Sequence, residues 1–321
     1  MRIVSEGLTY IYNEKSPFAT RALDSVSLTI ETGEFFGIIG HTGSGKSTFV
    51  QHLNGLIQVG EGRLTVGDVN LKKYTKKEYK AIRSAGMIDG LCFERGKKLG
   101  YKKYLKRYLK EIKALRASVG MVFQYPEYQL FGESVFADVA FGLKNFCPDY
   151  ADEQIEAAVK SAIERVGLDY NEVKDKSPFD LSGGQKRRVA IAGVIVTEPK
   201  VLVLDEPVAG LDPQGKKELM QLLHSLHGTV CDTVIIVSHD MDDVAENCTR
   251  VAVFSEGRLI CSLPPSELFK QAEMLSSVGL DVPVTASLTT ALAECGVEIE
   301  SDFTVDGFAL AVAKRYSEIK K

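Results

Sequence analysis

A glycine-rich loop between an apolar run and a helical segment constrains this chain more than any other feature. Residues 40–47 read Gly-His-Thr-Gly-Ser-Gly-Lys-Ser and match the pattern G-x-x-x-x-G-K-[ST]. The apolar residues 34–40 predict a buried strand, and residues 48–56 predict a helix. In this context backbone N–H groups converge on phosphate oxygens, and the helix directs its positive end toward them. The pattern therefore predicts a phosphate-binding loop, or P-loop.

Other apolar runs extend this local prediction to the whole fold. Further buried strands are predicted at residues 120–124, 201–205 and 233–238, with helices at 152–166 and 214–226 between them. Such alternation indicates an α/β fold with a largely parallel sheet. The remaining signals are an alternating strand at 26–30, a hairpin at 250–254 and 258–262 around Glu256-Gly257, and mostly helical residues after 263.

Composition excludes several classes of protein. Of the 321 residues 45% are hydrophobic and 26% charged, which argues for a folded chain with a sizeable core. No apolar run approaches the roughly 20 residues of a membrane-spanning helix. The six cysteines form no CxxC pair, so we expect neither structural disulfides nor zinc, and a reducing cytoplasm. The net charge of −4 argues against nucleic acid and acidic membranes as partners.

That average conceals a basic segment at residues 72–116. The segment holds 16 Lys and Arg against four Asp and Glu, and five of the 12 tyrosines. Thr75 and Glu78 have the spacing of a capping box. A basic amphipathic helix is predicted from the helical spacing of Tyr101, Tyr104, Leu105, Tyr108, Leu109, Ile112 and Leu115. Three interpretations stay open: contact with anionic lipid, docking on a partner, or a solvated, partly disordered insertion.

Four polar positions in and near the P-loop predict nucleotide chemistry. Lys46 can reach the β- and γ-phosphates, and the Ser47 hydroxyl can ligate Mg²⁺. Asp205 ends an apolar strand, where an open α/β sheet has its ligand site, and its carboxylate can hold Mg²⁺ through water. Glu206, one residue farther on, can polarise an attacking water.

The P-loop is shared by GTPases, nucleotide kinases, helicases and transport ATPases, so another segment must discriminate. Residues 181–185 read Leu-Ser-Gly-Gly-Gln, and here the chain resembles the nucleotide-binding subunits of ABC transporters, whose signature is LSGGQ. The resemblance covers about residues 2–265. It implies that Gln124 is the Q-loop glutamine, that His239 is the switch histidine, and that Tyr12 stacks on adenine, with Tyr10 as the alternative.

The resemblance also implies a mechanism. Two subunits pair head to tail, and the signature backbone of one covers ATP bound to the P-loop of the other. The catalytic residues would be Glu206 as general base, His239 and Gln124, and the Mg²⁺ ligands Ser47, Gln124 and Asp205. The implied nucleotide-binding residues are Tyr12, Gly40, His41, Thr42, Gly43, Ser44, Gly45, Lys46, Ser47, Thr48, Ser182, Gly183, Gly184, Gln185 and, in the D-loop, Asp212.

Finer features are similar to the A components of energy-coupling factor transporters: residues 123–131, 177–180 and 187–193 match that group. These ATPases power vitamin and metal-ion uptake from the cytoplasmic face of the membrane. They pair with a related A′ subunit or with themselves, on a transmembrane T component that carries substrate-binding S components. The acidic residues expected to meet arginines of the T component are Glu127, Glu133 and Asp138. The basic segment 72–116 is longer than the family usually has before the Q-loop.

The expected fold is therefore a P-loop NTPase of the ABC cassette type, with a mostly parallel core sheet, an antiparallel β subdomain and a helical subdomain. The cassette is expected at 1–265, with the insertion at 72–116 and the helical and signature subdomain at 125–190. A C-terminal appendix at 266–321 would serve pairing. Alternatives are the ATPase of an ordinary ABC importer, a soluble ABC ATPase associated with nucleic acid, and a nucleotide-binding scaffold without turnover. Only one P-loop and one LSGGQ are present, and no specific nucleic acid is expected.

Overall fold

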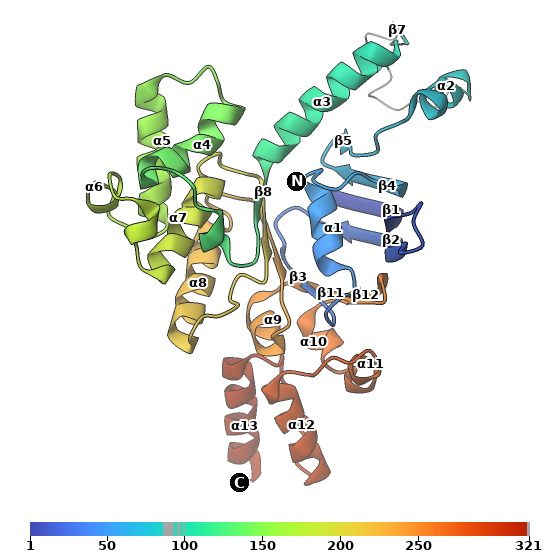
Figure 1. The fold of residues 1–321 in the computed structure, drawn as a ribbon. Coiled ribbons are helices and arrows are strands. Elements are labelled where there is room, and N and C mark those ends of the chain that lie inside the picture. The colour runs from blue at the N-terminus through green and yellow to red at the C-terminus, as the bar shows by residue number, and fades with distance from the viewer. Residues whose placement is uncertain (86–92, 95–96, 99, 320–321) are drawn as a thin grey trace.

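The larger of two main sheets organises the molecule. The computed structural model describes residues 1–85, 93–94, 97–98 and 100–319 (Figure 1). Six strands pair in the order β12-β11-β3-β10-β9-β8, and every neighbouring pair is parallel except β11–β12. They are β3 (Phe35–Ile39), β8 (Val119–Val122), β9 (Val201–Asp205), β10 (Thr233–Val237), β11 (Arg250–Ser255) and β12 (Arg258–Leu263). The predicted α/β fold with a largely parallel sheet is confirmed.

Both faces of this sheet are covered, which explains the uninterrupted apolar runs. Every residue of β3, β9 and β10 is buried. In β9, Leu202 and Leu204 join one hydrophobic cluster, and Val201 and Val203 join the other, on the opposite face. Because successive side chains alternate between faces, a strand buried on both sides has no polar face.

The predicted hairpin lies at the edge of the sheet. Strands β11 and β12 pair antiparallel around Glu256 and Gly257. Both residues have positive φ, 49° and 77°, as a two-residue turn of type I′ requires.

The second sheet is antiparallel and covers one face of the first. Its order is β2-β1-β4-β5. Its strands are β1 (Ile3–Tyr12), β2 (Thr20–Ile30), β4 (Glu61–Val66) and β5 (Val69–Asn70). Helix α1 (Lys46–Leu53) contributes Phe49, Val50 and Leu53 to the cluster on this face. The predicted strand at 26–30 is longer than expected, because β2 continues pairing with β1 back to Thr20.

Helices cover the opposite face. They are α4 (Val135–Phe146), α5 (Asp152–Arg165), α6 (Tyr170–Val173), α7 (Gly183–Ile195), α8 (Pro213–Leu226) and α9 (Met241–Asn247), with 3₁₀ turns η2 (Pro126–Gln129) and η3 (Pro178–Asp180). Buried residues from all six helices join the same cluster as Leu202 and Leu204. Figure 1 shows α4 to α7 gathered beyond β8, at the edge of the sheet away from α1.

The chain ends in four helices, α10 (Pro265–Leu268), α11 (Ala272–Ser277), α12 (Val284–Glu294) and α13 (Val305–Ile319). Leu268, Phe269 and Leu275 belong to the cluster that the cassette helices form. The hydrophobic core is thus continuous across residue 265, and a domain boundary there stays a prediction. Helices α12 and α13 project together from the body (Figure 1).

The described part of the basic segment is structured. It contains α2 (Lys76–Ala85), β6 (Phe93–Glu94), β7 (Lys97–Lys98) and α3 (Tyr101–Ser118); residues 86–92, 95–96 and 99 lie outside the described ranges. The capping box is confirmed: Glu78 N donates to Thr75 Oγ1 at 3.3 Å, and Thr75 N donates to Glu78 Oε2 at 2.7 Å. The predicted amphipathic helix is α3. The prediction is wrong for Leu109, which is 61% exposed because it lies about 100° around the helix from buried Tyr108.

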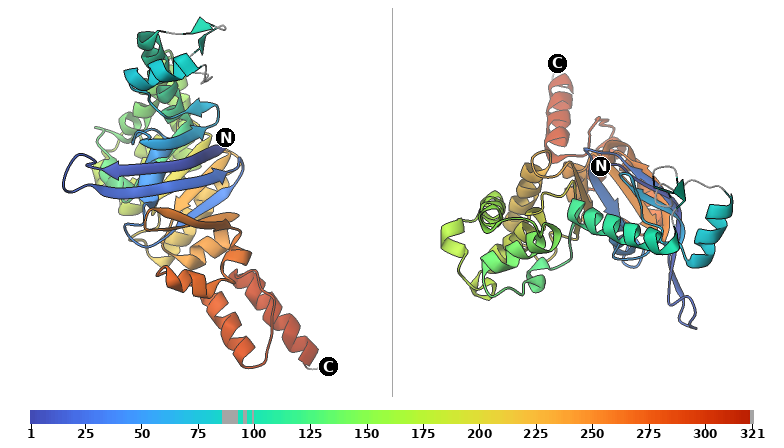
Figure 2. Two further views of the ribbon diagram at one scale, coloured as in Figure 1. Left: turned by 90° about the vertical axis from the view of Figure 1, so that its right-hand side faces the viewer. Right: turned by 90° about the horizontal axis from the view of Figure 1, so that it is seen from above.

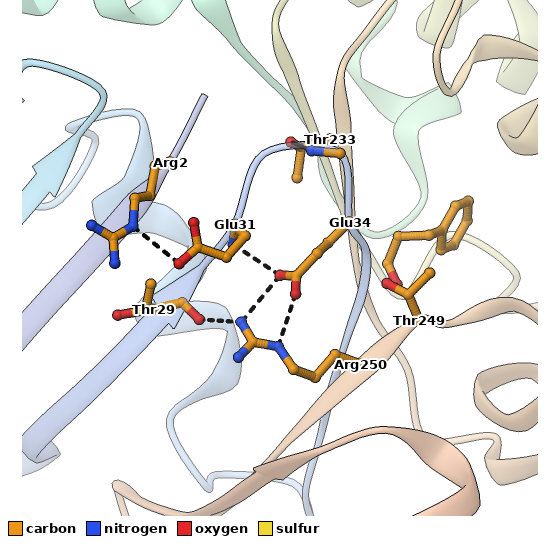
Figure 3. Close-up of polar contacts among 9 residues, drawn as sticks. Arg2, Thr29, Glu31, Glu34, Thr233, Thr249 and Arg250 are labelled. Carbon is orange, nitrogen blue, oxygen red and sulfur yellow. Dashed lines mark hydrogen bonds and ion pairs between the residues drawn. The ribbon is translucent and has the colours of Figure 1, made fainter.

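A polar cluster joins the two sheets (Figure 3). Arg250, the first residue of β11, forms an ion pair with Glu34 at 2.9 Å and donates to the carbonyl of Thr29 at the end of β2. Its guanidinium lies 5.2 Å from the centre of the Phe36 ring in β3. Arg250 therefore fixes the antiparallel sheet against the strand that leads into the P-loop.

Candidate functional site

The P-loop follows β3, and its glycines are sterically required. Gly45 has φ 100°, and a Cβ there would lie 2.5 Å from the carbonyl oxygen of Ala22. A Cβ on Gly40 would collide with the carbonyl oxygen of Phe254. No side chain caps the N-terminus of α1, so its first N–H groups face the loop without such a partner. This is the local geometry that a phosphate group needs.

Lys46 lies folded over the same loop. Its Nζ donates to the carbonyls of Gly40 at 2.6 Å and His41 at 3.0 Å, and the residue is 7% exposed. Burial lowers the pKa of the ammonium group, while the charges of Glu206 and Asp205 raise it. A buried cation whose hydrogen bonds within the described residues go to neutral carbonyls is electrostatically suited to an incoming phosphate.

Asp205 ends β9 next to the start of α1. Burial raises the pKa of its carboxyl group, the charge of Glu206 adds to this, and a hydrogen bond with Ser47 and the charge of Lys46 oppose it. Its Oδ1 is buried and has no hydrogen-bond partner within the described residues. A carboxylate with one unsatisfied oxygen, beside a hydroxyl, has the oxygen chemistry that Mg²⁺ prefers. The residues present thus fit a magnesium ion.

Three side chains from the ends of neighbouring strands meet beside Asp205. Glu206 follows β9, and its Oε2 accepts a hydrogen bond from Gln124 Nε2 at 2.9 Å. His239, after β10, has its Nδ1 3.8 Å from the same oxygen. Glu206 has φ 49°, a left-handed conformation that costs about 1–3 kcal/mol in a non-glycine residue and is typical of functional sites. Parallel strands bring these residues together because their carboxyl ends share one edge.

A pocket of about 260 Å³ opens beside the P-loop. It is lined by Tyr12, Thr20–Ala22 and Gly43–Thr48, and the Tyr12 hydroxyl lies 3.3 Å from Thr48 Oγ1. Tyr12 is 37% exposed, whereas the ring of Tyr10 packs against His52 at 5.0 Å. Of the two tyrosines that the sequence left open, Tyr12 faces the pocket. His41 and Thr42 are exposed on the loop but do not line this pocket.

The signature residues lie elsewhere. Ser182 caps α7, and its capping box uses both side chains: Gln185 N donates to Ser182 Oγ at 3.3 Å, and Ser182 N donates to Gln185 Oε1 at 3.1 Å. Gly183 and Gly184 are exposed, and a Cβ added to either would meet no atom of another described segment within 4 Å. Figure 1 shows α7 and α1 on different sides of β8. The chain therefore does not bring its own residues 182–185 to its own P-loop pocket.

Asp212, the D-loop residue, is also away from that pocket. It caps α8, where its Oδ1 accepts from Gly215 N at 2.8 Å. In this chain its carboxylate therefore serves as the N-terminal cap of α8.

Arg187 is a residue whose position the sequence did not reveal. It is 6% exposed in α7, and its guanidinium contacts both carboxylate oxygens of Glu127 at 3.1 and 3.2 Å. It also donates to the carbonyls of Pro207 at 3.0 Å and Ala209 at 3.2 Å, just after Glu206. Arg187 thus links the signature helix, the 3₁₀ turn after Gln124 and the segment after Glu206. The one sequence signal was a pair of adjacent arginines after the signature.

The structure also shows how the acidic residues predicted to meet a membrane partner are placed. Glu127 is occupied by Arg187. Asp138 is 8% exposed and accepts hydrogen bonds from the backbone N–H groups of Phe131 and Gly132. Both carboxylates therefore have partners within the chain, and a contact of either with a membrane partner stays a prediction. Glu133 is exposed and stays a candidate.

Comparison with known proteins gives a consistent result. The family model described as ABC transporter matches residues 23–209. The energy-coupling factor transporter ATP-binding protein EcfA2 of Clostridium tetani is 44% identical over 307 residues, covering 95% of this chain and 94% of that protein. Among solved structures, cbiO1 from Clostridium perfringens, part of the ABC transporter complex cbiONQ, has a TM-score of 0.63 at 36% identity, covering 90% of this chain and 98% of that one. The dimeric MJ0796, a bacterial ABC transporter cassette, has a TM-score of 0.61 at 25% identity, covering 82% and 98%.

The fold and the site together define a P-loop ATPase cassette of the ABC type. The chain belongs to the family of energy-coupling factor transporter ATP-binding proteins.

Proposed function

We propose that this chain binds MgATP and hydrolyses it as the ATPase subunit of an energy-coupling factor transporter. The observation that carries the proposal is the convergence of Lys46, Asp205, Glu206, Gln124 and His239 at one edge of the sheet. The family relationship supports the transport role. Within the described residues no helix is both long and apolar enough to span a bilayer. From the family relationship we infer attachment to transmembrane partners at the cytoplasmic face.

The site residues would have different roles in nucleotide binding and hydrolysis. Lys46 exchanges the carbonyls of Gly40 and His41 for the β- and γ-phosphates, which are stronger acceptors for an ammonium group. Ser47, Asp205 and Gln124 would hold Mg²⁺, which neutralises charge on the phosphate oxygens. Glu206 would accept the proton of the attacking water, and His239 would contact the γ-phosphate.

A second cassette would complete the site. Ser182, Gly183 and Gly184 are exposed at the start of α7 and remote from the chain's own pocket, so they are free to cover a nucleotide held by a partner. The dimeric relative supports such pairing. Helices α12 and α13 carry exposed apolar residues, Leu288, Val305, Leu310 and Tyr316 among them, and would add to the pairing surface. Transmembrane T and S components would select the substrate, a vitamin or metal ion.

The Gly184→Arg variant tests the shared site. Gly184 is exposed and has no close neighbours among the described segments, so the fold is expected to accept the arginine. The long side chain would keep a partner's nucleotide from reaching the N-terminus of α7. We expect the site that Gly184 covers to hydrolyse no ATP, so that the assembled transporter releases phosphate at steady state only from its other site. Nucleotide binding to the isolated chain should be unchanged. Turnover equal to wild type at every site would contradict the shared-site proposal.

The Tyr12→Ala variant tests the base contact. Stacking of a base on an aromatic ring is worth about 1–3 kcal/mol, so we expect ATP to bind about 5- to 150-fold more weakly. Tyr12→Phe keeps the ring and loses only the contact with Thr48, and it should bind ATP like wild type. Titration with a fluorescent ATP analogue measures both variants. An unchanged dissociation constant in Tyr12→Ala would exclude the stacking role.

A further inference from the structure

The side of α3 that carries Tyr104 and Tyr108 packs against the rest of the molecule. Tyr104 is fully buried, and its hydroxyl accepts a hydrogen bond from Tyr74 N at 2.8 Å. The Tyr108 hydroxyl donates to the carbonyl of Leu71 at 3.1 Å. Tyr79 of α2 stacks on Tyr104 with 4.9 Å between ring centres. These contacts fix the rotation of α3 about its own axis and therefore decide which side chains it presents outward.

The outer face of α3 is a row of lysines. All of its five lysines are exposed: Lys102, Lys103, Lys106, Lys110 and Lys113. Residues three and four apart lie on one face of a helix, so this set forms a continuous stripe opposite the tyrosines. Within the described part of the chain, α3 forms an ion pair between Arg107 and Glu111 at 2.9 Å, which includes none of the five. Leu109, 61% exposed, lies beside the stripe.

The chemistry of this face favours a lipid surface over a protein or a nucleic acid as its binding partner. Lysine is depleted at specific protein interfaces, where arginine and tyrosine are enriched, and here the tyrosines point inward. The same inward tyrosines leave no aromatic ring of α3 exposed for stacking on bases, as single-stranded nucleic acid requires. Lysines beside an exposed apolar residue are typical of helices that lie on anionic membranes.

The position of the helix agrees with this chemistry. Figures 1 and 2 show α3 at the end of the molecule opposite α12 and α13. Seen from above in Figure 2, α3 lies along that end with α2 beside it. Residues 72–116 carry a net charge of +12 in a chain of net charge −4, so the rest is strongly acidic. An anionic surface therefore attracts this end and repels the remainder, which orients the chain.

We propose that the lysine stripe of α3 binds anionic phospholipid headgroups and holds this end of the chain against the membrane. Each basic residue near an anionic surface contributes an attraction that adds up along the stripe. The inference goes beyond ATP hydrolysis and does not depend on it.

The test uses the full chain without nucleotide, so that its outcome is independent of the ATPase proposal. Sedimentation with phosphatidylcholine vesicles, with and without phosphatidylglycerol, measures binding. We expect binding to the anionic vesicles only. The triple variant Lys103→Gln, Lys106→Gln, Lys110→Gln should bind on the order of 100-fold more weakly. The control variant Lys160→Gln, Lys217→Gln, Lys314→Gln removes the same charge from exposed positions on α5, α8 and α13 and should bind like wild type.

Several results would overturn the proposal. Equal binding to neutral vesicles would exclude headgroup charge, as would binding that persists at about 1 M salt, where the screening length falls to about 3 Å. An equal loss in the control variant would show that net charge, and not α3, is responsible. Binding to polyuridylate with the same loss in the α3 variant, and none to vesicles, would assign the stripe to nucleic acid.

Discussion

Replacing Glu206 with Gln is expected to lower steady-state ATP hydrolysis by about 10²- to 10⁴-fold while ATP binding is retained. The amide keeps the size of the side chain and the contact with Gln124 but cannot accept a proton from water. Nucleotide binding rests on the P-loop and Lys46, which the substitution does not touch. Phosphate release and equilibrium ATP binding, measured on the same preparation, separate the two effects.

Glu198→Gln is a matched control for this variant. Glu198 also has a left-handed backbone, with φ 48°, and an exposed side chain that lies 3.5 Å from Arg165. It is not among the residues that line the nucleotide pocket. Hydrolysis by Glu198→Gln should match wild type. Wild-type hydrolysis by Glu206→Gln would refute the assignment of Glu206 as general base.

Arg187→Met is expected to lower the free energy of unfolding by about 3–5 kcal/mol, because it leaves the carboxylate of Glu127 without its buried partner. The carbonyls of Pro207 and Ala209 would also lose their donor. The double variant Arg187→Met, Glu127→Gln removes the unpaired charge and should recover part of the loss. Urea unfolding of the wild type, the single variant and the double variant measures these differences in the free energy of unfolding.

Arg188→Met controls for the loss of a neighbouring arginine. Arg188 donates to the carbonyl of Val166 and pairs with Glu218, but its side chain is 28% exposed. Ion pairs at exposed positions contribute about 0–1 kcal/mol, so this variant should unfold at nearly the wild-type urea concentration. Equal destabilisation by Arg187→Met and Arg188→Met would contradict the structural role given to Arg187.

The sequence predicted the elements whose pattern is set by burial on both sides of a sheet. Strands β3, β9 and β10 are continuous apolar runs because no face of them meets water. The convergence of Gln124, Glu206 and His239 was also predictable, since each follows a parallel strand of the same sheet. Their contacts of 2.9 and 3.8 Å agree with that expectation.

Contacts between distant segments could not be predicted. Glu127 and Asp138 look like surface residues in the sequence, and only the fold shows that Arg187 and two backbone N–H groups occupy them. Leu109 fits a helical apolar pattern, yet it is 61% exposed, whereas Tyr108 next to it is buried. The lysine stripe is visible as charge in the sequence, but its direction follows from where the tyrosines of α3 are buried.

The central claim is that this chain holds MgATP at its P-loop and that a second cassette covers it. The most direct measurement is a structure of the assembled transporter containing the Glu206→Gln variant and MgATP. We expect Lys46 Nζ on the phosphates and away from the carbonyls of Gly40 and His41, a metal ion beside Ser47 and Asp205, and the signature of the partner cassette on the γ-phosphate. A nucleotide bound while Lys46 stays on the two carbonyls, or bound without any signature residue from a second cassette, would contradict the account.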